Sequence, residues 1–422
     1  MKAKIRRFTT LELAVAAMLL NLNVQLSTVF AQGSLTPPGV PAPIMKSLDQ
    51  IEPRTPISSL PCIVSNSGSY YLTTNLFGSD GQDGIIVTAN NVTLDLNGFV
   101  LDGTVTVGAS IAQGQPAPQM RAIGSLNGIN ATPGVVNLVV RNGSLRGWGG
   151  SGVAADQCDG AVFERLRISG SGSWGLISGF RSTVRDCTVV SNPGGGITAD
   201  YHSLVSGCLS AENGGDGFWC PAGVTLRDCL AMNNGGDGVA AGDVSVFTDS
   251  TSRDNAGSGF SAGASSAIGG CTSTANNDTG ISVGANSVVK DCSVRSCFNG
   301  GIGTDNGCTV SGCAVCYIAG FAGIQVQAGC AVVNNTCSFM DNDSVPAIKV
   351  QSTGSRIEGN TVCSNYWGIV VEGTGNFIFR NTATANSSGN YTNAPGNVVG
   401  EIINVSGGAT ITNANPWANF SF

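Results

Sequence analysis

The chain has 422 residues, of which 60 are glycine, 11% are charged and only one is histidine. Its formal net charge is −7 with 20 Lys plus Arg, which argues against nucleic acid or an anionic membrane as a partner, because both require a basic surface. Such a length ordinarily indicates two or three domains. The repeat described below instead favours one elongated domain that grows by adding coils.

The N-terminal region has the pattern of an export signal. Basic residues begin at Lys2, a mostly apolar run covers Leu11–Leu20, and small residues precede Gln32, so residues 1–31 are predicted to be a signal peptide. We therefore expect an extracellular or cell-surface protein, with the periplasm as the alternative, and no transmembrane span in the mature chain. Residues 32–61 are rich in proline and are predicted to be an extended linker.

One short phrase returns every 21 residues between Arg181 and Cys313. Apolar residues alternate over only three to five positions within each repeat, which is strand periodicity, and helical spacing is absent. Short strands in units of this period predict stacked coils, in which each coil pairs with the one before. We expect residues 62–400 to form this solenoid and residues 401–422 to form a C-terminal cap with an aromatic tail. A recognition tail for export or surface attachment is the alternative for that ending.

Two columns of the repeat are predicted to point inward and to stack as ladders. They consist of Cys187, Cys208, Cys229, Cys271, Cys292 and Cys313, continued by Asn335, Asn360 and Asn381, and of Asn192, Asn213, Asn234, Asn255 and Asn276. The position before the first column holds only Gly, Asp and Asn from Asp186 to Gly359, which indicates a left-handed turn. Stacked cysteines would have Cβ atoms about 4.8 Å apart, which is more than the roughly 3.8 Å between the Cβ atoms of a disulfide. Free buried thiols are therefore expected.

Several phrases carry a resemblance to a known group. They are Arg54-Thr55-Pro56-Ile57-Ser58, Gly68-Ser69-Tyr70-Tyr71-Leu72, the run Asn91–Gly98, the Asn-Gly-Gly-Asp-Gly runs at 213–217 and 234–238, and the Asn-Pro-Trp-Ala-Asn-Phe ending. With them the chain resembles exported bacterial right-handed parallel β-helix repeat proteins of the pectin-lyase-like superfamily. The resemblance implies an all-β, right-handed parallel β-helix with three short strands in each coil of about 21 residues. This fold hosts lyases, hydrolases, epimerases, adhesins and binding proteins, so it implies no single activity.

The candidates for catalysis are Asp200 and the single histidine, His202. A histidine acting as general base requires an orienting carboxylate, and Asp200 is the conceivable partner. The alternative is that His202 is a solvated surface residue. Asp200 and Asp305 lie five coils apart, or about 24 Å, whereas the carboxylate pair of a glycosidase needs roughly 5–9.5 Å, so these two cannot act together.

The candidates for ligand binding are basic and aromatic. Arg185, Arg227 and Lys290 recur on one outward row and could contact an acidic glycan, with Trp219 and Tyr201 as sugar platforms. A weak calcium site between stacked carboxylates in the Gly-Gly-Asp-Gly runs is the one metal alternative, and no other cofactor is expected.

The sequence therefore predicts a monomeric, exported β-helix that acts by surface display or by binding a polysaccharide or cell-envelope glycan. The alternative is a divergent polysaccharide lyase, glycoside hydrolase or epimerase acting on an acidic glycan. Its site would lie near the irregular segments Gly108–Gln119 and Asp341–Pro346, gathered with Asp200, His202 or Lys349 on one flank.

Overall fold

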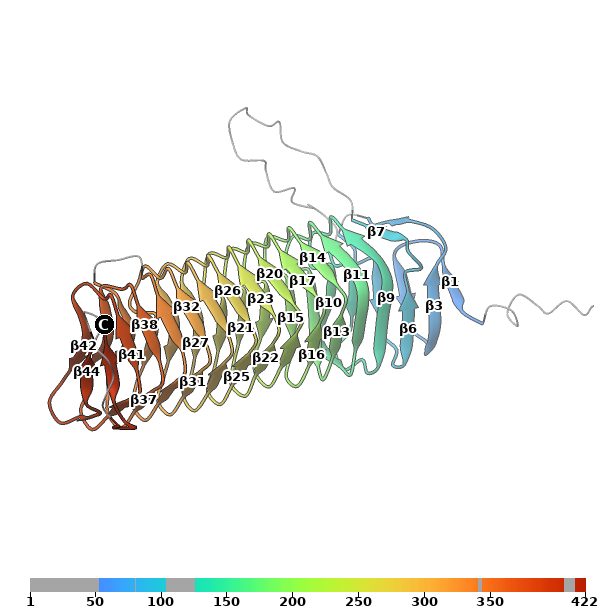
Figure 1. Ribbon diagram of the computed structural model, residues 1–422. Coiled ribbons are helices and arrows are strands. Elements are labelled where there is room, and N and C mark those ends of the chain that lie inside the picture. The colour runs from blue at the N-terminus through green and yellow to red at the C-terminus, as the bar shows by residue number, and fades with distance from the viewer. Residues whose placement is uncertain (1–52, 80, 104–125, 341–343, 406–413) are drawn as a thin grey trace, which may run out of the picture. The chain divides into compact units, whose positions relative to one another are not determined.

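The computed structural model describes residues 53–79, 81–103, 126–340, 344–405 and 414–422. In these residues every regular element is a β-strand, so no helix is present that is long and apolar enough to cross a membrane. Coils stack in chain order from β1 to the C-terminus within the unit Arg54–Phe422 (Figure 1). Nearly all strand pairs are parallel and join one coil to the next, which confirms the predicted solenoid.

The strands form three parallel ladders, here called ladders 1, 2 and 3, and ladders 1 and 2 are joined through the long strands β9 and β11. Ladder 1 contains β1 (Thr55–Ile57), β3 (Gly68–Leu72), β6 (Val92–Asp95), β9 (Leu138–Arg146), β11 (Val162–Ser169), β13 (Thr183–Arg185), β16 (Leu204–Ser206), β19 (Thr225–Arg227), β22 (Val246–Thr248), β25 (Ala267–Gly269), β28 (Val288–Lys290), β31 (Thr309–Ser311), β34 (Ala331–Val333), β37 (Arg356–Glu358), β40 (Phe377–Phe379) and β43 (Val398–Val399). Ladder 2 contains β4 (Leu76–Phe77), β7 (Val100–Asp102), the second halves of β9 and β11, β14 (Thr188–Val190), β17 (Leu209–Ala211), β20 (Leu230–Met232), β23 (Thr251–Arg253), β26 (Thr272–Thr274), β29 (Ser293–Arg295), β32 (Ala314–Cys316), β35 (Thr336–Ser338), β38 (Thr361–Cys363), β41 (Thr382–Thr384), β44 (Ile402–Asn404) and β45 (Asn419–Ser421). Ladder 3 contains β2 (Cys62–Val64), β5 (Ile85–Val87), β8 (Ile129–Ala131), β10 (Val153–Asp159), β12 (Leu176–Phe180), β15 (Ile197–Ala199), β18 (Phe218–Cys220), β21 (Val239–Ala241), β24 (Phe260–Ala262), β27 (Thr279–Val283), β30 (Gly300–Thr304), β33 (Ile324–Val326), β36 (Pro346–Val350), β39 (Trp367–Val371) and β42 (Gly389–Asn393).

The strands are short because each coil turns at left-handed residues. In one repeat these are Asp186, Ser191 and His202, with φ of 55°, 56° and 60°. The Gly, Asp and Asn column that begins at Asp186 is left-handed as predicted, since these residue types adopt positive φ at low cost. In ladders 1 and 2 the central residue of most three-residue strands points inward, whereas strands of ladder 3 such as β24 bury their first and third residues.

The asparagine ladder is confirmed in atomic detail. Asn213 Nδ2 donates to Asn234 Oδ1 at 3.0 Å, and Asn234 Nδ2 donates to Asn255 Oδ1 at 3.0 Å. The same oxygens accept backbone N–H groups of the preceding coil, so each buried amide joins neighbouring coils. Asn335 fills the corner after Cys313 and accepts the N–H of Cys313 at 2.9 Å, which confirms that Cys and Asn are alternative fillings of one corner.

All fifteen cysteines are free, and those of the predicted column are buried. Cys187 Sγ and Cys208 Sγ each donate to a carbonyl two residues earlier, at 3.3 Å in both cases. Outside the column, burial raises the pKa of Cys158 to about 11 and that of Cys220 to about 12, so these thiols stay neutral at physiological pH. The thiols therefore pack as small apolar groups.

Strands are present in two segments to which the sequence analysis assigned a linker and a cap. Strand β1 lies inside the stretch assigned to the linker, and Pro56 is accommodated there because, among the described strands, β1 is an edge strand that pairs with β3 alone. At the other end β44 and β45 lie within the expected cap, so the aromatic tail itself forms a strand of the stack. The predicted signal peptide, the predicted linker up to residue 52, and the segment Gly108–Gln119 lie outside the described residues.

Candidate functional site

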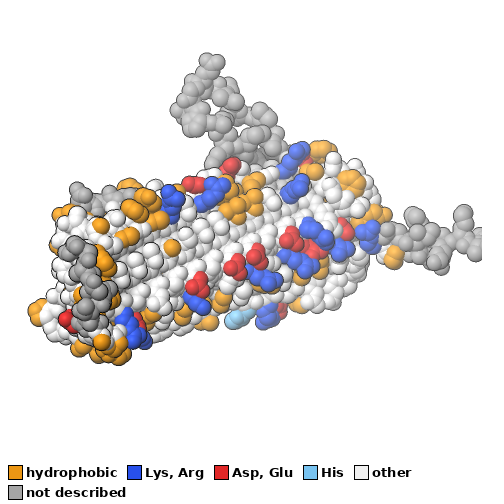
Figure 2. All heavy atoms as spheres, viewed as in Figure 1, with side chains coloured by type: hydrophobic (Ala, Val, Ile, Leu, Met, Phe, Trp, Pro, Cys, Tyr) orange, Lys and Arg blue, Asp and Glu red, His pale blue; other side chains and the backbone are white. Residues whose placement is uncertain are grey.

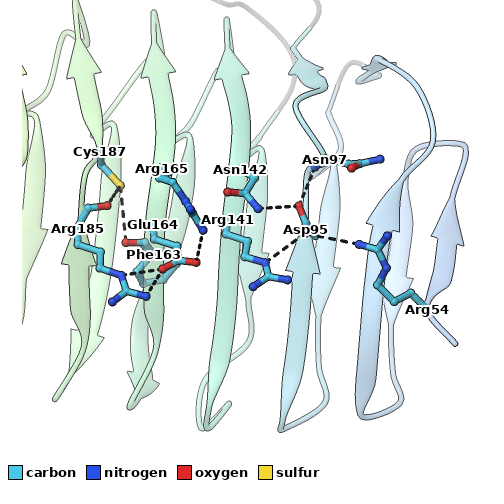
Figure 3. Close-up of polar contacts among 10 residues, drawn as sticks. All are labelled: Arg54, Asp95, Asn97, Arg141, Asn142, Phe163, Glu164, Arg165, Arg185 and Cys187. Atoms are coloured by element: carbon cyan, nitrogen blue, oxygen red, sulfur yellow. Dashed lines mark hydrogen bonds and ion pairs between the residues drawn. The ribbon is translucent and has the colours of Figure 1, made fainter. Parts of the chain in front are cut away.

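A network of ion pairs crosses the first coils of ladder 1. Asp95 accepts from Arg141 Nε at 3.2 Å and lies 3.6 Å from Arg54 Nη1. Glu164 accepts from Arg165 at 3.0 Å and is hydrogen-bonded through its other oxygen to Arg185 (Figure 3). These pairs arise because residues from successive coils, Asp95, Arg141, Glu164 and Arg185, stand next to one another in the ladder register.

The acids Asp95 and Glu164 are buried, whereas their arginines range from partly exposed, at Arg54 and Arg141, to exposed, at Arg165 and Arg185. The side chain of Glu164 is 7% exposed, whereas those of Arg165 and Arg185 are 59% and 52% exposed. Asp102 is likewise 17% exposed beneath Arg146, which is 61% exposed and donates to it at 2.8 Å. A guanidinium has five N–H donors, so each arginine keeps donors for a ligand after it pairs with its carboxylate. The surface presented to solvent is therefore cationic, although the pairs are neutral.

An open groove adjoins this network on the outward face of ladder 2. It consists of two hollows of about 420 and 310 Å³ that share Ser144, Arg167 and Thr188. Arg165 lines the first hollow and Arg146 lines the second. We call this surface the arginine groove. Ser144, Arg167 and Thr188 are aligned in register on β9, β11 and β14, so Arg167 stands in the middle of the row.

Arg167 is exposed and, among the residues that the structure describes, has no hydrogen-bond or ion-pair partner. Arg165 is left-handed, with φ of 52°, in the corner column that otherwise holds Gly, Asp and Asn from Asn142 to Gly359. A bulky residue in this conformation costs about 1 kcal/mol, and Val244, Tyr317 and Arg380 adopt it at other corners, so the turn fixes the direction of Arg165 without by itself marking a site. The groove therefore offers one unpaired and two oriented guanidinium groups to an anionic ligand.

A comparison with models of known protein families identifies the fold. Residues 127–272 match the family model described as "Right handed beta helix region". The described strands form a right-handed parallel β-helix. This confirms the fold that the resemblance to the pectin-lyase-like superfamily implied. No curated protein sequence matches the β-helix.

Several solved structures are similar to this β-helix. The A-module of the Azotobacter vinelandii mannuronan C-5 epimerase AlgE4 is 16% identical, with 79% of this chain and 91% of that chain covered and a TM-score of 0.40. The periplasmic alginate epimerase AlgG is 11% identical, with 81% and 78% covered and a TM-score of 0.38. The pectate lyase Pel9A is 14% identical, with 59% and 70% covered and a TM-score of 0.36. At these identities no residue role is carried over to this chain.

The two catalytic candidates, Asp200 and His202, make separate contacts in the structure. Asp200 Oδ1 accepts the backbone N–H of Tyr201 at 2.7 Å, and no hydrogen bond between Asp200 and His202 occurs in the described part of the chain. His202 occupies a left-handed turn position and is exposed, and its ring lies 6.5 Å from that of Tyr201 at a tilt of 51°. These contacts account for His202 as a surface turn residue.

The ligand candidates lie on different faces. Arg185, Arg227 and Lys290 end strands of ladder 1, whereas Trp219 projects from ladder 3. Tyr201 stacks on Phe180 at 6.3 Å in the turn between those ladders. Figure 2 shows Lys and Arg side chains beside Asp and Glu side chains in a row along the stack, with mostly uncharged surface around them. Of the candidates, only Arg185 belongs to the buried-acid network described above.

Other polar candidates have structural partners. Asp216 Oδ1 accepts the N–H of Asp237, and Asp237 Oδ1 accepts the N–H of Ser258, at 2.8 and 2.7 Å. These bonds join each aspartate of the Gly-Gly-Asp-Gly runs to the backbone of the next coil. Lys349 forms an ion pair with Glu372 at 3.0 Å beside a hollow of about 250 Å³ that Ser344 and Pro346 also line. Lys349 therefore lies beside the end of the irregular segment Asp341–Pro346, whose residues 341–343 are outside the described ranges.

We expect the Glu164 network to give the protein an acid-sensitive component of stability. Burial raises the pKa of Glu164, but the hydrogen bond and charge of Arg185, with those of Arg165, outweigh it and lower the pKa overall. A lowered folded-state pKa stabilises the fold above the ordinary glutamate range near 4.3, and this contribution is lost as the pH falls through the folded-state value. Glu164→Gln should therefore cost about 1–2 kcal/mol at pH 7, since the arginines are solvent-screened.

The measurement is urea denaturation of wild-type protein and Glu164→Gln at a series of pH values between 7 and 3. The difference between the two should shrink towards zero as the pH falls. Glu212→Gln, at an exposed carboxylate in a turn, is the matched control and should change little at any pH. A cost of Glu164→Gln that stays constant with pH would contradict the role of the ion pairs.

Proposed function

We propose that this β-helix is an exported protein that binds an acidic polysaccharide in the arginine groove and acts by binding or display. The observation that carries the proposal is Arg167, exposed and unpaired within the described residues, between two arginines held by carboxylates of the same or the preceding coil. Arginines that are already oriented lose less side-chain entropy when they bind an anion, so the groove is organised before the ligand arrives.

The charge of the chain supports an acidic ligand at this place in particular. With a net charge of −7, most of the protein repels a polyanion, and the paired carboxylates near the groove lie beneath their arginines. One exposed carboxylate, Asp186, lines the first hollow together with Arg165 and Arg167, so the cationic groups outnumber it there. Ser144 and Thr188 add hydroxyl groups that can donate to carboxylate or sulfate oxygens along the same row. Export to the cell surface, predicted from residues 1–31, would place the groove where such polymers occur.

The competing function is a divergent polysaccharide lyase, hydrolase or epimerase. The observation that favours it is the hollow on ladder 3, where Lys349, Glu372 and Trp367 gather beside the residues that follow the segment 341–343. A pocket with an aromatic wall and two charged groups has the composition of a sugar-binding site. Cleavage would require one of these groups to act as an acid or base, which Lys349→Ala would test.

The experiment incubates the mature protein with acidic and neutral polysaccharides and follows co-sedimentation, unsaturated products and reducing ends together. We expect binding to acidic polymers, weakening from about 0.05 to 0.5 M salt, without new chain ends. Arg165→Ala with Arg167→Ala should weaken binding at least tenfold, because a hydrogen bond to a charged group contributes about 1.5–3 kcal/mol.

The matched control is Arg227→Ala, at an exposed arginine of ladder 1 outside the groove, which should change binding less than twofold. Loss of binding in Arg227→Ala but not in the double variant would move the site to the row of Arg185, Arg227 and Lys290. New chain ends that disappear in Lys349→Ala would establish the enzyme instead. Absence of binding to every acidic polymer would refute the proposal.

A further inference from the structure

The C-terminal strand β45 lies between two strands of consecutive coils. It pairs in parallel with β41 on one side, with Thr382 opposite Phe420, and with β44 on the other, with Ile403 opposite Phe420. In the preceding coils ladder 2 strands pair directly, as β38 does with β41. On ladder 1 the last two coils also pair directly, through β40 and β43. On ladder 2, but not on ladder 1, the last coil is therefore separated from its neighbour by the width of one strand. We call this space between β41 and β44 the slot, and β45 fills it.

The slot recognises the tail through buried, specific bonds. Asn419 is fully buried and continues the asparagine ladder, because its Oδ1 accepts both the backbone N–H and the Nδ2 of Asn381 at 3.0 and 3.1 Å. Its Nδ2 donates to the carbonyls of Ile378 and Gly400, each at 3.0 Å. Asn419 thus contacts both walls of the slot.

A second set of contacts holds the residues that precede β45. The ring of Trp417 meets the ring of Phe379 edge-on at 5.3 Å, and the guanidinium of Arg380 lies 4.7 Å above the Trp417 ring. Arg380 Nε also donates to the carbonyl of Pro416 at 2.8 Å. The segment 415–422 therefore contributes an aromatic anchor, Trp417, a buried amide, Asn419, and a strand, β45. A peptide that adds a strand to a sheet binds through contacts of the same kinds.

The same end of the β-helix has open edges and apolar surface. Among the described residues β42, β43 and β44 each pair on one side only. Val398, Ile402 and Trp417 are 59%, 43% and 53% exposed. Open strand edges with exposed apolar side chains favour contact with another β-sheet. A second copy of this chain presents the same edges and the same tail.

We propose that the slot between β41 and β44 is a binding site for segment 415–422 of a second copy, so that two copies exchange tails end to end. Every contact above is non-covalent, and none requires the tail to come from the same chain. Asn419 follows Val405 by fourteen residues, so the connection can span at most about 45 Å, and exchange requires the two slots to lie within that distance. Exchange of an identical element is a low-cost route to a dimer, because each bond is remade in the partner.

The test compares full-length protein with a variant that ends at Ala414. Full-length protein should form dimers whose fraction rises with concentration in light scattering, and the shortened variant should not. The shortened variant should bind a labelled peptide of residues 415–422 saturably, and the peptide with Asn419→Ala at least tenfold more weakly. Full-length protein that remains monomeric up to about 1 mM, or dimers that persist in the shortened variant, would overturn the exchange.

A second measurement covers the case in which the shortened variant does not fold. Full-length copies with two different affinity tags are mixed, warmed and cooled, and analysed by native mass spectrometry. Mixed dimers are expected for wild-type tails, and their fraction should fall at least tenfold when both copies carry Trp417→Ala, which removes the anchor outside the buried ladder. Absence of mixed dimers, or an unchanged fraction in Trp417→Ala, would overturn the proposal.

Discussion

Trp148→Ala is expected to destabilise the N-terminal coils by about 3–5 kcal/mol, since it removes the largest fully buried side chain and leaves a cavity. The indole Nε1 donates to the carbonyl of Leu101 at 3.1 Å, so the substitution also removes a buried hydrogen bond. Three glycines make room for the ring. A Cβ on Gly78, Gly84 or Gly128 would approach it to 2.7, 2.6 or 2.9 Å. The surrounding backbone cannot close the cavity easily, because its strands are fixed in ladder register.

The effect should be measured by urea denaturation and by amide hydrogen exchange. Because neighbouring coils in a solenoid stabilise one another locally, protection should fall in β4 to β10 more than in β30 to β41. Trp219→Ala is the matched control, as this tryptophan is 45% exposed on ladder 3 and should cost less than about 0.5 kcal/mol. Equal costs at both positions would contradict the assignment of Trp148 to the core.

Asn234→Ala should cost about 2–4 kcal/mol in the middle of the stack. Asn234 Oδ1 accepts both the backbone N–H and the Nδ2 of Asn213, at 3.1 and 3.0 Å. Its Nδ2 donates to the Ser210 carbonyl and to Asn255 Oδ1, at 3.1 and 3.0 Å. Alanine leaves the backbone N–H of Asn213 buried without this acceptor, and each such orphaned group costs about 1–3 kcal/mol.

The control for the ladder is Asn277→Ala, at an exposed asparagine whose backbone N–H bonds to Asn255 and is retained by alanine. It should lie within about 0.5 kcal/mol of wild type in the same denaturation experiment. Asn234→Asp separates the accepting from the donating role, since a carboxylate accepts but cannot donate. If Asn234→Ala and Asn277→Ala proved equally mild, the ladder would not be a source of stability.

Much of the fold could be predicted because the repeat is regular between Arg181 and Cys313. A period of 21 residues with in-register stacking places each column residue over its equivalent, so Asn192 and Asn213 had to meet. The left-handed turn at Asp186 was readable for the same reason, as only a few residue types adopt positive φ at low cost. The free thiols followed from the spacing of stacked strands.

The ion-pair network beside the arginine groove could not be predicted, because the coils that build it are irregular in length. Asp95 and Arg141 are 46 residues apart and still adjacent in space, since the chain between them includes a long insertion. Arg141 and Glu164 are paired in register at a separation of 23 residues, and Glu164 and Arg185 at 21. A period of 21 residues, taken from the regular coils, therefore pairs the wrong residues in this part of the chain. Opposite charges near these spacings were the one signal that could have indicated the network.

By itself the sequence determined the solenoid, its period and the identity of its ladders, because local turn chemistry and strand alternation repeat in every coil. Only the tertiary structure decided which charges meet, that Asp200 and His202 do not pair, and that β45 enters between β41 and β44. The physical reason is the same in each case. These contacts depend on the number of residues in each coil and on the place where β45 joins the stack. The local pattern of turn residues and alternating strand residues predicts neither.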